Sequence, residues 1–210
     1  MKDENIFTWN WPMLRYLSTT DCYIQDPIDD GNCLMSALLM CTFHSHTNFD
    51  CFMSRNQIND FLIGHPDLYL SSFVLTTISE WAHDNLIEMG RSIEKFENPL
   101  LLYTEIMQDA TPGKCEYGSL LEAFAFCEMK KINLVVYQII DSSTYHIMTW
   151  KHTNDSAPTV CILYLHELQH YQALLCQSPL DIQTFNDSTT SVSKNNLSSI
   201  SNTKCKMTCN

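Results

Sequence analysis

The order of hydrophobic and polar residues predicts helices in the first two thirds of the chain and strands in the last third. Residues 33–41 (CLMSALLMC) are apolar almost all round and contain no glycine or proline, which is typical of a buried helix. Further helices are predicted at 54–61, 78–89, 99–107 and 119–130. Short β-branched apolar runs predict strands at 132–140, 145–150, 159–165 and 170–175. Helices that come first and strands that cluster later indicate the α+β class.

Capping and turn residues suggest where several of these elements begin and end. Ser54 is suited to begin a helix, and Gly90 is suited to end one. Pro99 fits the first turn of the helix that it opens. The turn residues at 141–143 would allow the two strands that flank them to pair.

The composition changes near residue 177. From Gln177 to Asn210, Ser, Thr and Asn supply half of the 34 positions, and apolar residues are sparse. Such a segment buries too little apolar surface to offset its ordering entropy, so we expect a flexible tail at 177–210.

Charge and glycine content argue against several classes of function. The 24 acidic residues outnumber the 12 basic ones, which disfavours nucleic-acid binding. The five glycines form neither a dinucleotide-binding motif nor a phosphate-binding loop, so no cofactor is expected. No apolar run is long enough to span a membrane, and the first twelve residues do not resemble a signal peptide. We therefore expect a cytoplasmic protein whose ten cysteines do not form disulfides.

One cysteine stands where a nucleophile would be expected. In the sequence DDGNC, Cys33 follows a polar turn and opens the apolar helix at 33–41. The positive end of a helix dipole and its unpaired N–H groups favour a thiolate, and the same N–H groups can bind an oxyanion. Gly31 permits a sharp turn and the close approach of a substrate. A buried structural cysteine is the alternative interpretation.

A cysteine nucleophile needs a base, usually a histidine that the fold brings close to it. Of the eight histidines, His170 stands at the start of a predicted strand, where an imidazole would be held rigidly.

The same passage offers a zinc-protease interpretation. Residues 166–170 (HELQH) match the HExxH motif, in which His166 and His170 would bind zinc and Glu167 would be the base. No third histidine or glutamate ligand follows, however, and the residues before His166 indicate a strand. A second group, Cys41, His44, His46 and Cys51, matches no common zinc spacing, so we expect no metal site.

Three blocks together resemble the ovarian tumour (OTU) family of cysteine proteases. They are DGNCL at 30–34, YGxxxExxA at 117–125 leading into INLVVY at 132–137, and the run from Ile162 to His170-Tyr171. The blocks follow the family's order and cover residues 26–176, which leaves 1–25 as an N-terminal extension.

The resemblance implies a papain-like α+β fold and cleavage after the C-terminal glycine of ubiquitin or a ubiquitin-like modifier. In that reaction Cys33 would be the nucleophile and His170 the base and later the acid. The resemblance also suggests supporting roles for four residues around them. These are Asp30 as the acidic residue of the nucleophile loop, Gly31 and Asn32 in the oxyanion loop, and Tyr171 in the substrate channel.

The sequence departs from the family pattern two residues after the histidine. Gln172 stands where Asp or Asn usually orients the imidazole, and an amide stabilises imidazolium less than a carboxylate does. A catalytically weak or inactive ubiquitin-binding relative is therefore the alternative to an active enzyme. Met35 and Ser36 also differ from the family's usual residues, which should alter packing beside the cysteine.

Overall fold

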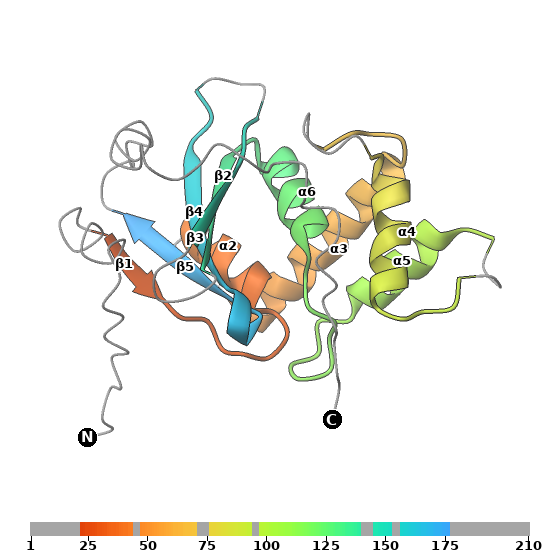
Figure 1. Cartoon of the computed structure of the whole chain (residues 1–210), viewed down its shortest axis with the longest axis horizontal. Helices are drawn as coiled ribbons and strands as arrows, with labels where there is room; N and C mark the ends of the chain where they lie inside the picture. Colours follow the sequence, from red (N-terminus) through yellow and green to blue (C-terminus); the bar gives the residue numbers. More distant parts are fainter. Residues whose placement is uncertain are drawn as a thin grey trace.

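The computed structural model describes residues 22–43, 47–70, 76–93, 97–139, 145–152 and 156–176 (Figure 1). The helices in these segments are α2 (Cys33–Phe43), α3 (Asn48–Gly64), α4 (Ile78–Glu88), α5 (Pro99–Gln108), α6 (Leu120–Lys130) and the short 3-10 helix η1 (His166–Leu168). The strands are β1 (Cys22–Gln25), β2 (Asn133–Ile139), β3 (Tyr145–Trp150), β4 (Thr159–Leu165) and β5 (His170–Cys176). The α+β class predicted from the order of elements is confirmed.

The strands form one mixed sheet in the order β1-β5-β4-β2-β3. Strands β2 and β4 are parallel, and every other pair is antiparallel. The predicted pairing of the two strands that flank 141–143 is confirmed, because β2 and β3 pair from Leu134 with Trp150 to Ile139 with Tyr145. Residues 141–143 themselves lie outside the described residues. The inner strands β2 and β4 are buried along most of their length, as expected where neighbouring strands and helices cover them.

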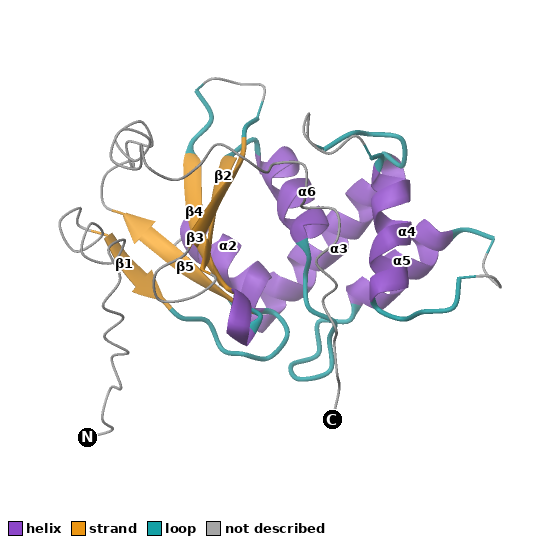
Figure 2. Ribbon diagram, in the orientation of Figure 1, coloured by secondary structure: helices purple, strands orange, loops and turns teal. Residues whose placement is uncertain are grey.

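Helix α2 lies between the sheet and the other helices (Figure 2). It packs against β5 and β4 on one side and against α3 on the other. All residues from Cys33 to Met40 are consequently buried, which explains why this segment is apolar almost all round. The position of α2 fixes its first residue next to the sheet.

Local capping explains most helix boundaries. The Thr77 and Ser119 side chains each form a capping box with the glutamate three residues later, at the starts of α4 and α6. Asn98 caps α5 directly before Pro99, and Gly90 follows α4 with a φ of +70°. The predicted start of α3 at Ser54 is wrong, because the helix begins at Asn48. Thr47 caps it instead, its side chain accepting a hydrogen bond from the Asp50 N–H, and Ser54 lies buried within the helix.

The sheet begins before residue 26. Strand β1, at Cys22–Gln25, lies in the range assigned above to an N-terminal extension and pairs with the end of β5. The predicted tail at 177–210 lies outside the described residues, as do His44 and His46. No helix in the described segments is long and apolar enough to cross a membrane.

Candidate active site

Cys33 is the first residue of α2, and its backbone N–H points out of the helix. The Asn32 carbonyl accepts a hydrogen bond from the Ser36 N–H at 2.9 Å, the first bond of the helix. In a trans peptide the C=O and N–H point in opposite directions, so the Cys33 N–H faces away from the helix body. The predicted combination of a cysteine, a helix start and an outward N–H is therefore present.

The carbonyl groups of the turn before Cys33 accept hydrogen bonds from other segments of the chain. The Asp30 carbonyl accepts from the Gly113 N–H at 2.7 Å and from the Cys115 thiol at 3.3 Å. The Gly31 carbonyl accepts from Arg55 Nη2 at 3.0 Å. The N–H groups of Gly31 and Asn32, in the same two peptides, are turned the opposite way. The predicted oxyanion loop is thus anchored through its carbonyls.

Asp30 and Asn32 support the turn itself. The Asp30 carboxylate accepts from the Asn32 N–H at 2.9 Å, so that N–H is already in use. The Asn32 side chain is buried and binds Arg55 and the Ala110 carbonyl. Among the described residues, the N–H groups of Gly31 and Cys33 have no partner, and they are the donors left for an oxyanion.

Glycines permit two close approaches around Cys33. Gly31 has a φ of +87°, and a Cβ there would lie 2.6 Å from Cys115 Sγ and 2.8 Å from the Cys115 carbonyl oxygen. A Cβ on Gly118 would lie 2.7 Å from Leu34 Cδ2. Gly118, the glycine of the YG pair in the second sequence block, therefore packs directly on the residue that follows Cys33.

His170 opens β5, and the HELQH passage is not a zinc-binding helix. Its first three residues form η1, and Gln169 then adopts a left-handed conformation with a φ of 49°. His166 and His170 are consequently not one turn apart on a helix face, as the zinc-protease motif requires. No group of three or more His, Cys, Asp or Glu residues suited to a metal occurs in the described segments.

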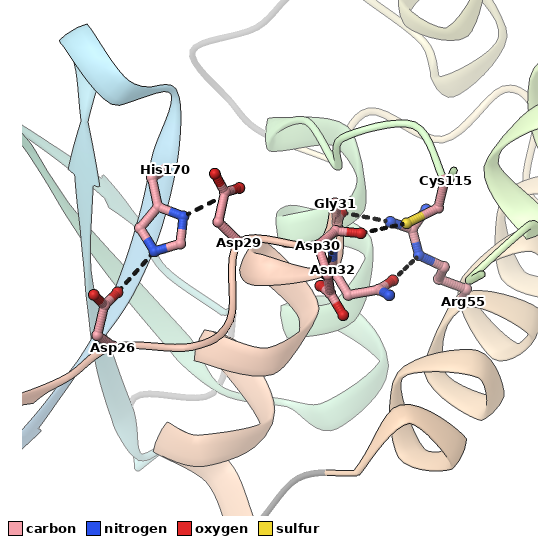
Figure 3. Close-up of polar contacts among 8 residues, drawn as sticks. All are labelled: Asp26, Asp29, Asp30, Gly31, Asn32, Arg55, Cys115 and His170. Atoms are coloured by element: carbon pink, nitrogen blue, oxygen red, sulfur yellow. Dashed lines mark hydrogen bonds and ion pairs between the residues drawn. The ribbon is translucent and has the colours of Figure 1, made fainter. Parts of the chain in front are cut away.

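The His170 imidazole lies between two carboxylates from the loop that leads to Cys33 (Figure 3). Its Nε2 is 2.7 Å from Asp26 Oδ1, and its buried Nδ1 is 3.7 Å from Asp29 Oδ1. Interaction with the Cys33 side chain, and secondly a hydrogen bond to Asp26, raises the pKa of His170 from 6.5 to about 9 against the opposing effect of burial. With Nε2–H donated to Asp26, Nδ1 is the nitrogen available to the thiol.

Sequence reasoning missed Asp26, whose carboxylate accepts the imidazole hydrogen bond that was expected for Gln172. The described structure gives the His170 imidazole a hydrogen bond to Asp26 and none to Gln172, which is half-buried on β5. Asp26 directly follows β1, whose last residue Gln25 pairs with Ala173. Asp26 could thus have been found only through the pairing of β1 with β5, and β1 lay outside the predicted domain. Asp30 contacts the turn rather than the imidazole.

Five other cysteines are held as thiols. Burial raises the pKa of Cys41 to about 11 and that of Cys161 to about 12. Burial is also the first cause of the raised pKa of Cys51, Cys115 and Cys127. Of the cysteines whose side chains are described, Cys33 is the one that joins a helix N-terminus to a histidine.

Tyr171 belongs to the hydrophobic core in the structure. It is buried, and its ring lies 4.7 Å from that of Tyr164, centroid to centroid. A role for Tyr171 in a substrate channel stays a prediction.

Solved structures with a similar fold were found, although no protein-family model and no curated protein matches the chain. The OTU domain of OTUD1 aligns with a TM-score of 0.50 at 17% identity, covering 77% of this chain and 90% of that domain. The OTU domain protease from Dera Ghazi Khan virus aligns with a TM-score of 0.51 at 14% identity, covering 77% and 85% respectively. At these low sequence identities, the structural alignments establish similarity of fold alone. Together with the mixed sheet and the five α-helices of the described segments, these alignments show that the chain has the fold of the OTU domain.

Proposed function

We propose that this protein is a cysteine protease that cleaves peptide or isopeptide bonds after the C-terminal glycine of ubiquitin or a ubiquitin-like modifier. The observation that carries the proposal is the juxtaposition of three groups. Cys33 begins α2, its thiol interacts with the His170 imidazole, and Asp26 accepts a hydrogen bond from the far side of that imidazole. This is the nucleophile, base and orienting acceptor of a thiol protease.

The fold and the sequence support the class of reaction and of substrate separately. One protein of similar fold, from Dera Ghazi Khan virus, is described as an OTU domain protease. Ubiquitin as the substrate rests on the three sequence blocks that resemble the OTU family. Asp26 also supports an active enzyme over an inactive relative, because its carboxylate accepts the imidazole hydrogen bond that Gln172 was expected to accept.

The reaction follows from the positions of these groups. The Cys33 thiolate attacks the carbonyl carbon of the terminal glycine, and the N–H groups of Cys33 and Gly31 stabilise the oxyanion. The C–N bond breaks as the His170 imidazolium gives its proton to the leaving amine, which leaves a thioester on Cys33. Neutral His170 then takes a proton from water, hydroxide adds to the thioester carbonyl, and the thiolate is released. Asp26 holds the imidazole throughout and stabilises its charged form.

The test combines a ubiquitin probe carrying a C-terminal electrophile with cleavage of diubiquitin. We expect the probe to label Cys33, and Cys33→Ala and His170→Ala to abolish turnover. Cys161→Ala, at a buried cysteine on β4, and His166→Ala are matched controls that should retain it. A chelator should have no effect.

Other outcomes would overturn the proposal. Loss of activity in His166→Ala together with inhibition by a chelator would favour zinc chemistry. Saturable ubiquitin binding without labelling or cleavage would identify a non-catalytic binding protein.

A further inference from the structure

A buried arginine on α3 binds the turn at 30–32 that leads into Cys33, which is called the nucleophile turn below. Arg55 is 2% exposed, and no carboxylate in the described part of the chain lies within ion-pair distance of it. Burying a charge is costly unless its donors are satisfied, so the contacts of Arg55 indicate what this residue is for.

Its donors bind backbone carbonyls and one amide from three separate segments. Nη2 donates to the Gly31 carbonyl at 3.0 Å, and Nε donates to Asn32 Oδ1 at 3.0 Å. Nη1 binds the Met107 carbonyl near the end of α5 at 3.0 Å, and Nη2 also binds the Glu116 carbonyl at 2.9 Å. Figure 3 shows the guanidinium beside the turn, on the side away from His170. One planar group therefore joins the turn to α5 and to the segment that precedes Tyr117 and Gly118.

Contact between α3 and α5 alone does not require the four hydrogen bonds of Arg55. Asn59, one turn further along α3, joins the same two helices through a single hydrogen bond from Nδ2 to the Thr104 carbonyl at 2.9 Å. Arg55 differs because two of its four bonds end on the turn itself. Lysine could not reproduce them, since its ammonium is a point charge without the planar fork of donors.

We infer that Arg55 is a positioning residue that sets the oxyanion-binding conformation of the nucleophile turn. Its bond to the Gly31 carbonyl fixes the plane of the Gly31–Asn32 peptide, and its bond to the Asn32 side chain fixes the residue before Cys33. The Gly31–Asn32 peptide lies between the two peptides that carry the Gly31 and Cys33 N–H groups, so a change in its plane would turn both of these donors. The inference rests on the proposed function and adds to it a residue outside the nucleophile, base and acceptor.

The experiment compares wild type, Arg55→Lys and the matched control Asn59→Ala in two reactions of Cys33. The first is hydrolysis of a fluorogenic ubiquitin C-terminal amide, which passes through an oxyanion. The second is alkylation by chloroacetamide, which displaces chloride and forms no oxyanion. Melting temperatures are measured in parallel, and both reactions are run below the lowest of them.

Arg55→Lys should lower kcat by about 10- to 100-fold with KM changed less than about twofold, in line with partial loss of oxyanion stabilisation. Its alkylation rate should stay within about threefold of wild type, because that reaction does not use the turn N–H groups. Asn59→Ala should lower the melting temperature and leave kcat unchanged.

Each remaining outcome decides a different question. If wild type shows no turnover, the proposed function is wrong and this inference falls with it. If wild type turns over and folded Arg55→Lys has the same kcat, or loses alkylation in parallel, the inference about Arg55 alone is wrong. If Arg55→Lys does not fold, Asn32→Ala decides instead. That variant removes one Arg55 acceptor, so it should lower kcat more than alkylation, and equal effects on both would overturn the inference.

Discussion

The charge state of His170 is set by residues on both sides of its ring. Cys33 raises the pKa of the imidazole most, and Asp26 adds to the increase through its hydrogen bond to Nε2. A pKa of about 9 keeps the imidazolium, which must protonate the leaving amine, populated through neutral pH. Activity should accordingly persist to alkaline pH and fall as His170 loses its proton.

Replacing Asp26 by Asn should move the alkaline limb of the kcat/KM profile to lower pH. The substitution removes a negative charge that stabilises imidazolium, so the pKa of His170 falls. We would measure kcat/KM against pH with the fluorogenic ubiquitin substrate. Gln172→Ala is the matched control and should leave the limb in place, because the amide does not bind the imidazole. A shift in Gln172→Ala but not in Asp26→Asn would reverse the two assignments.

At the scale of the elements, the local sequence predicted those helices and strands whose bounds are set by interactions between nearby residues. The helix at α6 and the strand at β2 were expected because the spacing of apolar residues acts over a few residues. The start of α3 was misplaced because two residues, Thr47 and Ser54, both suit a cap and burial decides between them. Burial depends on the whole fold, so the sequence alone could not choose.

The α3 boundary can be tested through its cap. Thr47→Ala removes the acceptor for the Asp50 N–H and should lower the free energy of unfolding by about 1 kcal/mol. Thr47→Ser is the control, since a serine hydroxyl can accept the same bond. Denaturant unfolding measures both, and equal stability of the Ala and Ser variants would show that Thr47 does not cap the helix.

The site divides in the same way between local and distant contributions. The nucleophile turn could be predicted because a glycine, a cysteine and a helix start follow one another in sequence. Asp26 and His170 are 144 residues apart, and Arg55 reaches the turn from a different helix. The pairing of β1 with β5 brings Asp26 to His170, and the packing of α3 brings Arg55 to the turn. Neither contact can be seen in the local sequence. Asp26 and Arg55 were therefore the part of the site that sequence could not predict.

At the scale of the whole molecule, the two halves of the site belong to different layers. Cys33, the proposed nucleophile, begins a helix that packs on the sheet, and His170, the proposed base, begins a strand of that sheet. The α2–β5 interface holds these two elements together. The edge strand β1 pairs with β5, and this pairing places Asp26, the residue after β1, beside the His170 imidazole.

Strand β1 should therefore be required for both stability and activity. Two truncated chains, 22–210 and 26–210, differ by β1 alone, so their comparison isolates it. Loss of β1 exposes the hydrogen-bonding edge of β5 and frees Asp26, which then begins the chain. We expect chain 26–210 to melt at a lower temperature and to have a lower kcat than chain 22–210, measured by thermal unfolding and by hydrolysis of the fluorogenic ubiquitin substrate. Equal kcat in the two chains would mean that Asp26 keeps its position without the strand, and the orienting role assigned to the β1–β5 pairing would be wrong.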